Sequence, residues 1–349
     1  MSHYVILNFE DPDPGAGPGP IRAHVTRKAT ALPGNVKGSA SDTVAGTIGK
    51  ARRKETRFGK NSVHHYSCVE LAQSDKAKTL GRSEVQAIRE DIRKAKKIYI
   101  IMHGKPDDTE KGFSNMVQGQ QVEYTWQELA NLALLLFPDA GHTYRITLIM
   151  CYGARTGSYR MNQNGTLPPN ELKSSFAYKF FRAFAASRNV VMTAMTGQVQ
   201  TEKTDGTNLV ETEETVAATL DHIAYKKDTA TRAALKAQKQ TWDAHPGLPK
   251  GQYDELQKQF ALNPDADPGT DPLKIFLKQY YFENGHRNAL LLQAKSDAAA
   301  KHGGKSSVDK YGRIVYRYTN GVLTISNKYG DPANGVPANQ VLYNGPLLL

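Results

Sequence analysis

His103-Gly104 follows the apolar run Lys97-Ile98-Tyr99-Ile100-Ile101-Met102, and Cys151-Tyr152-Gly153 follows the apolar run Tyr144-Arg145-Ile146-Thr147-Leu148-Ile149-Met150. Short continuous apolar segments rich in β-branched residues are typical of parallel strands buried on both faces. Parallel strands of one sheet share a direction, so we expect His103 and Cys151 to emerge at the same edge of the sheet. In open α/β sheets ligands bind at that carboxyl edge.

The flanking sequence predicts an alternation of strands and helices. Further strands are expected at residues 3–9, 62–71 and 190–195, and helices at 83–96, 125–137 and 174–187, with polar loops at 104–121 and 152–172. Ser83 is a candidate N-cap, and Thr125 with Glu128 has the spacing of a capping box. This order predicts an α/β fold with a mostly parallel sheet and helices on both faces.

The rest of the chain suggests added segments around this core. Helices are expected at 228–242, 253–260 and 273–283, and Asn320-Gly321 lies between two alternating segments, which is a strong hairpin signal. We therefore divide the chain into an N-terminal strand with a basic Pro/Gly-rich arm (1–60), a catalytic core (61–207), a helical insertion (208–305), and a C-terminal hairpin and tail packed on the core (306–349).

Charge is concentrated in one part of the 349 residues. The net charge is +11, and the segment 22–97 alone carries 18 Lys and Arg against 7 Asp and Glu. Such a field favours polyanions, either anionic lipid head groups or polyphosphates, although a merely solubilising surface is the other interpretation. Aromatic residues do not alternate with the basic ones, as a stacking platform would require, so no specific nucleic-acid partner is expected.

The termini and the cysteines restrict the cellular setting that we expect. Residues 1–10 lack the basic start and apolar core of a signal peptide, and the longest aliphatic run, Leu132–Phe137, is too short to cross a bilayer. Two cysteines cannot build a disulfide scaffold, so synthesis in a reducing compartment is expected.

The thiol and the imidazole form a candidate catalytic pair. A Cys151 thiolate can attack an acyl carbon, and His103 can carry the proton to the leaving group. The backbone N–H groups of Gly104 and Cys151 are candidate oxyanion donors. Gly104 has no side chain that could block the substrate, and the N–H of a cysteine at a strand end is free to point at an oxyanion. The alternative is a buried structural cysteine and a loop histidine, since free cysteine is among the most buried residue types.

Four further residues are candidates for a substrate pocket. Asp107 and Asp108 would favour a basic side chain of the substrate, whereas Arg155 would select an acidic group by bidentate pairing. Gln198 begins a polar segment after the 190–195 strand that could line the pocket or form an ordinary turn. The sequence does not choose between these readings.

No metal site is expected. His64-His65-Tyr66-Ser67-Cys68 offers three potential ligands, but no second cluster stands at the spacing of a zinc site. We therefore expect no metal and no required cofactor.

The order of strand, His-Gly, helix, strand and Cys resembles the caspase, gingipain and separase class of cysteine peptidases, known as clan CD. The nearest likeness is to the self-cleaving cysteine protease domains of large bacterial toxins. There too His-Gly-Lys follows the strand, as in His103-Gly104-Lys105, and an aromatic helix (176–184), a strand (190–195) and a C-terminal hairpin from Tyr311-Gly312-Arg313 come later. Met150 departs from the pattern, because a small residue usually precedes the family's cysteine.

The resemblance implies a Cys151–His103 dyad without an obligatory third acid, and an oxyanion hole formed by Gly104 and Cys151. It further implies a bacterial effector or toxin component that cleaves a protein, including itself, and that is made in the bacterial cytoplasm and exported without a classical signal peptide. The same analogy offers a polyanion such as inositol hexakisphosphate as an activator that is not required. A thiol-dependent deamidase or acyltransferase, and a non-enzymatic binding module, are the alternatives that remain open.

Overall fold

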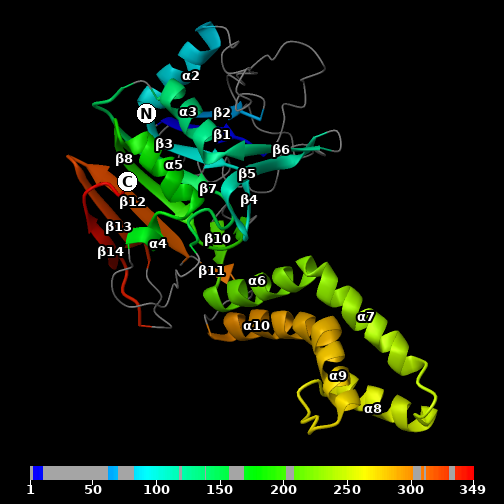
Figure 1. Ribbon diagram of the computed structural model, residues 1–349. Helices are drawn as coiled ribbons and strands as arrows, with labels where there is room; N and C mark the ends of the chain where they lie inside the picture. The colour runs from blue at the N-terminus through cyan, green and yellow to red at the C-terminus, as the bar shows by residue number, and fades with distance from the viewer. Residues whose placement is uncertain are drawn as a thin grey trace. The chain divides into compact units, whose positions relative to one another are not determined.

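A computed structural model of the chain contains an α/β unit and a separate helical unit (Figure 1). The structure describes residues 3–10, 62–69, 82–117, 120–137, 139–156, 169–201, 208–301, 308–309, 312–329 and 335–349. The chain divides into two compact units, one formed by 1–213 with 308–349 and the other by 214–307.

The first unit is built on one eight-stranded sheet. Its strands follow the spatial order β14-β13-β12-β8-β7-β3-β1-β2. Their bounds are β1 His3–Asn8, β2 Ser62–Ser67, β3 Ala95–Ile101, β7 Thr143–Ile149, β8 Asn189–Met195, β12 Arg313–Thr319, β13 Val322–Asn327 and β14 Val341–Gly345. Strands β2, β1, β3, β7 and β8 are parallel to one another, whereas β12, β13 and β14 continue the sheet in antiparallel pairing. The α/β class and the mostly parallel sheet are as expected.

Two small antiparallel sheets lie beside the main one. The strand orders are β4-β5-β6 and β11-β10-β9. The strands are β4 His103–Lys105, β5 Asp108–Val117, β6 Gln120–Thr125, β9 Val199–Thr201, β10 Asn208–Glu211 and β11 Val308–Asp309. The helices of this unit are α2 Arg82–Lys94, α3 Trp126–Leu136, α4 Pro169–Leu172 and α5 Phe176–Ala185.

Strand alternation divides the core into two clusters. One face of the sheet carries a large cluster that includes Leu7, Ile100, Leu148, Met192 and Tyr316, and the opposite face carries a small cluster that includes Tyr4, Ile6, Tyr99, Ile101 and Ile149. Because successive strand residues point to opposite faces, strands buried on both sides need continuous apolar runs. This explains why the buried parts of the two runs, 98–102 and 146–150, are apolar apart from Thr147.

Helices α2, α3 and α5 all contribute to the large cluster, so in the described part of the chain the core helices cover the same face. The expected arrangement on both faces is therefore not what these three helices adopt. The reason is the direction of the connections: β2 to β3, β3 to β7 and β7 to β8 all step the same way across the sheet. Right-handed crossovers that step in one direction place their helices on one side.

The caps of these helices account for where they begin. Thr125 and Glu128 form the expected capping box at the start of α3, and Ser175 accepts a hydrogen bond from the Tyr178 N–H at the start of α5. The predicted cap Ser83 lies inside α2, which begins one residue earlier. Helix α5 buries four phenylalanines, Phe176, Phe180, Phe181 and Phe184. Burying each such ring stabilises the fold by about 1.5–3 kcal/mol.

Two segments differ from the expectation. Residues 104–121 were expected to be a loop, but the described residues form most of the β4-β5-β6 sheet. Apolar residues do not alternate with polar ones along β5, and Phe113 and Tyr124 are buried among the side chains that the structure describes in this sheet. Strand β1 was assigned to a separate N-terminal segment, yet it lies within the sheet between β2 and β3.

The C-terminal hairpin forms where Asn-Gly predicted it. Asn320 and Gly321 adopt φ of 52° and 81°, the left-handed values that a tight hairpin turn requires. Strand β12 pairs with β8 in antiparallel fashion, so the hairpin extends the sheet rather than packing on its surface. Strand β14, which the sequence analysis did not predict, pairs with β13.

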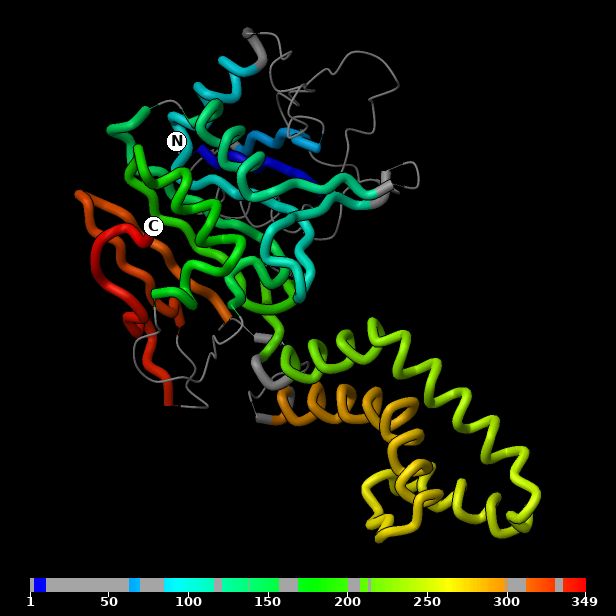
Figure 2. The backbone as a smooth tube through the Cα atoms, viewed as in Figure 1, coloured from blue at the N-terminus to red at the C-terminus, as the bar shows by residue number. Residues whose placement is uncertain are grey.

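The second unit is a helical excursion between β10 and β11, two strands that pair through Glu211 and Val308 (Figure 2). Its helices are α6 Glu213–Lys227, α7 Thr229–Asp243, α8 Lys250–Leu262, α9 Pro272–Tyr281 and α10 Arg287–Lys301, with a π-helical turn at Phe282–His286. Leu235, Phe260, Phe276 and Leu277 form its core. Arg287 pairs with both Asp221 and Glu283, which connects α10 to α6.

Among the described residues, no helix combines the length and apolar character needed to span a membrane. The basic segment 22–97 lies largely outside the described residues, and the part of it that the structure describes comprises 62–69 and 82–97.

Candidate active site

Three chemically active side chains occupy equivalent positions at the ends of three adjacent strands. Asn8 of β1 pairs with Ile101 of β3, and Ile101 pairs with Ile149 of β7. Two residues beyond each of these positions stand Glu10, His103 and Cys151. Adjacent strands lie about 4.8 Å apart. The register therefore aligns a carboxylate, an imidazole and a thiol along the carboxyl edge of the parallel sheet.

Backbone contacts hold the ends of β3 and β7 together. The Met102 N–H donates to the Ile149 carbonyl over 3.1 Å, which continues the pairing past the last strand residue. Further along, a methyl group on Gly104 would lie 2.0 Å from the Cys151 carbonyl oxygen and 2.9 Å from Met150 Cγ. Only a residue without a side chain fits there. Glycine at position 104 thus lets the His103 segment contact the Cys151 backbone.

The His103 ring lies between a carboxylate and an amide. Its Nδ1 is 3.5 Å from Glu10 Oε1, and its Nε2 is 2.6 Å from Asn115 Oδ1. The Asn115 N–H also donates to the Glu10 carbonyl over 2.7 Å, which connects β5 to the end of β1. The Glu10 side chain is only 3% exposed, whereas that of His103 is 38% exposed. The imidazole is therefore oriented from the inside and remains accessible from the outside.

The Cys151 side chain is partly buried. Burial raises its pKa to about 11, and the negative charges of Glu10 and Glu211 act in the same direction. The N–H of Val199 in β9 opposes this effect by donating to Sγ over 3.3 Å, as does the N–H of Cys151 itself. At neutral pH the resting side chain is therefore a thiol, and a base must remove its proton before it can attack.

The turn after the cysteine is fixed by a buried hydrogen bond. Tyr152 has a φ of 57°, an uncommon value for a residue with a side chain. Its N–H donates to the Gly197 carbonyl over 3.0 Å, and its hydroxyl donates to Glu211 Oε2 over 2.7 Å. Burial, followed by the charge of Glu211, raises the Tyr152 pKa well above its usual range. The phenol therefore remains a donor at every physiological pH.

The four predicted pocket residues have different positions. Asp107 is exposed, and Asp108 Oδ1 accepts the N–H groups of Glu110 and Lys111, a local turn interaction. Arg155 is only 6% exposed. Gln198 is exposed between β8 and β9, and its N–H donates to Glu211 Oε2 over 3.4 Å. The structure therefore joins Gln198 to the Glu211–Tyr152 pair beside Cys151.

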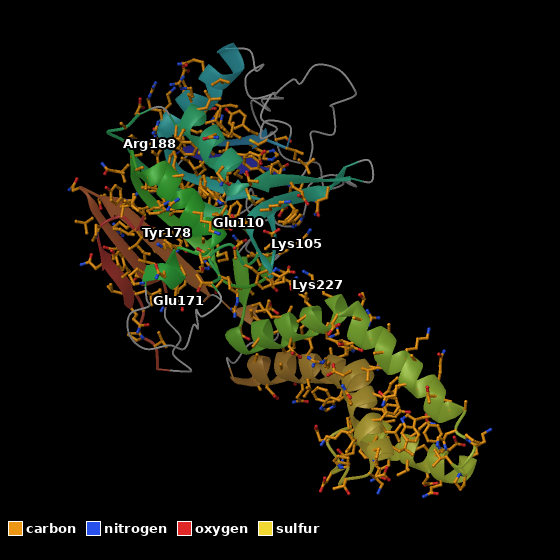
Figure 3. All side chains as sticks on the ribbon, in the orientation of Figure 1. Lys105, Glu110, Glu171, Tyr178, Arg188 and Lys227 are labelled. Atoms are coloured by element: carbon orange, nitrogen blue, oxygen red, sulfur yellow. The ribbon has the colours of Figure 1, made fainter. Side chains whose placement is uncertain are left out.

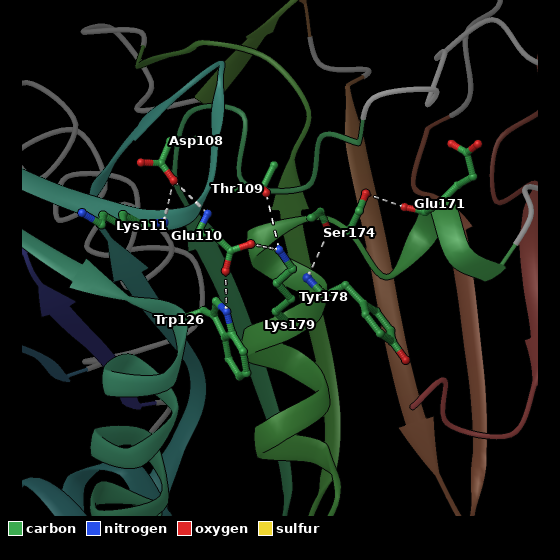
Figure 4. A network of polar contacts seen from close by, with 10 residues as sticks. Asp108, Thr109, Glu110, Lys111, Trp126, Glu171, Ser174, Tyr178 and Lys179 are labelled. Carbon is green, nitrogen blue, oxygen red and sulfur yellow. Dashed lines mark hydrogen bonds and ion pairs between the residues drawn. The ribbon is translucent and has the colours of Figure 1, made fainter.

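Polar contacts anchor the β4–β5 hairpin to the helical layer. Glu110 accepts a hydrogen bond from Trp126 Nε1 over 2.9 Å and pairs with Lys179 of α5 (Figure 4). Lys105 Nζ lies 3.7 Å from the centre of the Phe113 ring, and Figure 3 labels Lys105 and Glu110 on this hairpin. These contacts support the hairpin that contains both His103 and Asn115.

The His64–Cys68 segment, which was considered as a metal site, forms most of β2 and the residue after it. His64 Nδ1 lies 2.8 Å from an oxygen of Asp91 in α2. Cys68 is fully buried, and burial raises the pKa of its thiol strongly. Within the described residues, no group of three or more His, Cys, Asp or Glu is arranged to hold a metal ion.

The sequence analysis missed three components of the site: Glu10, Asn115 and Val199. Glu10 follows the first predicted strand directly, so its position at a strand end was visible in the sequence. The sequence did not show that this strand, β1, pairs with β3, because the pairing joins residues more than 90 positions apart. Asn115 and the N–H of Val199 carried no visible signal, since each acts from a segment that was expected to be a loop or turn.

A comparison of the chain with protein-family models and with characterised proteins finds no match.

Proposed function

We propose that this chain is a cysteine peptidase of caspase-like fold, with Cys151 as the nucleophile and His103 as the proton carrier. The observation that carries the proposal is the register of β3 and β7, because His103 and Cys151 each come two residues after paired strand ends, Ile101 and Ile149. The close approach of Gly104 to the Cys151 carbonyl adds independent support. The antiparallel addition of β12 and β13 to β8 agrees with the C-terminal hairpin that the resemblance implies.

The proposed reaction proceeds in two stages. First His103 takes the Sγ proton, Sγ bonds to the carbonyl carbon of the substrate, and the C=O electron pair moves onto oxygen. Collapse of this oxyanion breaks the C–N bond, and His103 gives its proton to the departing amine. Then water attacks the thioester, the C–S bond breaks, and the acid product and the thiol are released.

The raised pKa of Cys151 suits a nucleophile that is activated only when substrate binds. A thiol with a pKa of about 11 holds little thiolate at neutral pH, so its resting reactivity is low. The exposed side of the His103 ring leaves room for a substrate carbonyl. We propose the Gly104 and Cys151 N–H groups as oxyanion donors.

The partner and setting follow from the same proposal. The substrate is a protein, including the chain itself, and the chain acts as a bacterial effector or toxin component. Binding of a polyanion such as inositol hexakisphosphate, or of an anionic lipid, would use the basic segment 22–97, which carries 18 Lys and Arg against 7 Asp and Glu. A change in melting temperature on adding inositol hexakisphosphate tests this part separately.

The proposal is tested by comparing the wild-type protein with Cys151→Ala and His103→Ala. Each is incubated with a cell proteome and alone, and new N-termini are identified by mass spectrometry. Termini that arise only with the wild-type protein support peptidase activity. A mass increase of about 1 Da in a target, without new termini, would instead indicate deamidation, because an amide NH₂ is replaced by OH. Identical termini from all three proteins would refute the peptidase assignment.

A further inference from the structure

We infer that Glu10 is a positioning residue for the imidazolium of His103 in the Cys151–His103 pair, an inference that rests on the proposed function. The resemblance implies a dyad without a third acid, so this carboxylate goes beyond the expected chemistry. Glu10 comes from the first strand of the chain, 93 positions before His103 in the sequence. Sheet pairing places the two at equivalent ends of neighbouring strands.

Burial is the first argument. The Glu10 side chain is 3% exposed at the end of a strand, where solvent would be easily reached. A buried carboxylate is costly unless partners compensate for its lost hydration. His103 Nδ1, 3.5 Å from Oε1, is a nearby group that can become a cation. The gain from this contact is therefore largest when the ring is protonated, which is the state formed during attack.

The second argument comes from the other ring nitrogen. Asn115 Oδ1 can only accept a hydrogen bond, so the Nε2 that lies 2.6 Å away must be the donor. In the neutral ring, Nδ1 is then the bare nitrogen and receives the proton of the thiol. Glu10 lies on this same nitrogen, and its charge also reaches Cys151, whose pKa it raises. The charge of one carboxylate thus acts on both groups of the proton transfer.

The two effects of Glu10 have opposite signs, and this makes the role measurable. By raising the pKa of Cys151, the carboxylate suppresses the resting thiolate. By pairing with the imidazolium once Nδ1 has taken the proton, it holds the protonated ring in place and favours the thiolate during attack on a substrate. Removing the charge should therefore speed simple alkylation and slow peptide cleavage. A variant that merely folds less well would have a lower melting temperature. Slower cleavage together with a lower pKa of the thiol, at an unchanged melting temperature, therefore indicates the role proposed for Glu10.

The test uses the full chain with Glu10→Gln, which retains the shape of the side chain, and Glu10→Asp, which retains its charge. We expect Glu10→Gln to reduce the cleavage rate on the order of 10- to 100-fold. We also expect it to move the pH profile of Cys151 alkylation by iodoacetamide to lower pH. Glu10→Asp should recover part of the cleavage rate.

Asp91→Asn is the matched control. It removes a carboxylate from another histidine of the same sheet, since Asp91 lies 2.8 Å from His64 Nδ1. It should change neither cleavage nor the alkylation profile, whatever it costs in melting temperature. The inference would be overturned if Glu10→Gln cleaved at the wild-type rate and its alkylation profile were unshifted. In that case Cys151→Ala would still be inactive and the peptidase assignment would stand. Cleavage that persists in Cys151→Ala would instead refute the peptidase itself, and the alkylation profile would still decide whether Glu10 acts on the thiol.

Discussion

The Cα of Gly104 lies so close to Cys151 that a methyl group placed on it would stand 2.0 Å from the Cys151 carbonyl oxygen. That oxygen belongs to the backbone and cannot rotate away, as the end of a side chain could. The residue after the histidine is therefore in direct contact with the residue that carries the thiol. Two segments almost 50 positions apart can therefore make contact only because residue 104 has no side chain.

Substituting Gly104 by alanine should disturb the site and the fold together. The strand ends would have to separate, and overpacking of this kind costs about 1–3 kcal/mol. We expect urea unfolding to show that loss, and cleavage to fall because His103 moves away from Cys151. Gly141→Ala is the control, because nothing lies within 4 Å of the added carbon. Equal stability of Gly104→Ala and Gly141→Ala would contradict the close contact.

Alkylation of Cys151 should follow the raised pKa of the thiol. With a pKa of about 11, the thiolate fraction rises with pH throughout the range from 7 to 10. The rate of reaction with iodoacetamide should therefore increase about tenfold per pH unit, without a plateau. Cys68, which is fully buried, should react far more slowly in the same samples. Peptide mapping distinguishes the two sites, and a plateau for Cys151 near pH 7 would show that its pKa is not raised.

Tyr152→Phe should destabilise the turn that follows the nucleophile. It removes the hydroxyl that donates to Glu211 Oε2 and leaves a buried carboxylate short of one partner. The expected cost is about 1–3 kcal/mol in the free energy of unfolding. Tyr343→Phe removes an exposed hydroxyl bonded to the Pro346 carbonyl, so it should cost much less. Similar losses for both variants would argue against a special role of the Tyr152–Glu211 bond.

Thr125→Ala should weaken the start of α3. The substitution removes the side chain that accepts the Glu128 N–H and breaks the capping box. Loss of such a cap costs about 1 kcal/mol. Thr143→Ala changes an exposed residue at the start of β7 and serves as a comparison, with an expected effect within about 0.5 kcal/mol. The two midpoints of urea unfolding should differ clearly if the cap contributes as expected.

Local patterns in the sequence were enough for much of the fold. The continuous apolar runs predicted the central strands, Asn320-Gly321 predicted the hairpin, and Thr125 with Glu128 predicted the start of a helix. Each of these signals acts between residues that are close in the chain. Polar strands such as β5 escaped prediction, because apolar and polar residues do not alternate along Asp108–Val117.

The sequence by itself determined that a histidine and a cysteine each follow a buried strand, because the apolar runs end where those residues begin. Only the tertiary structure decided which strands are neighbours, and with that the alignment of Glu10 with His103 and Cys151. It also decided that Asn115 meets His103 Nε2 and that the Val199 N–H meets the sulfur. The physical reason is that pairing between parallel strands depends on the packing of the whole sheet, whereas helix caps and turns depend on a few adjacent residues.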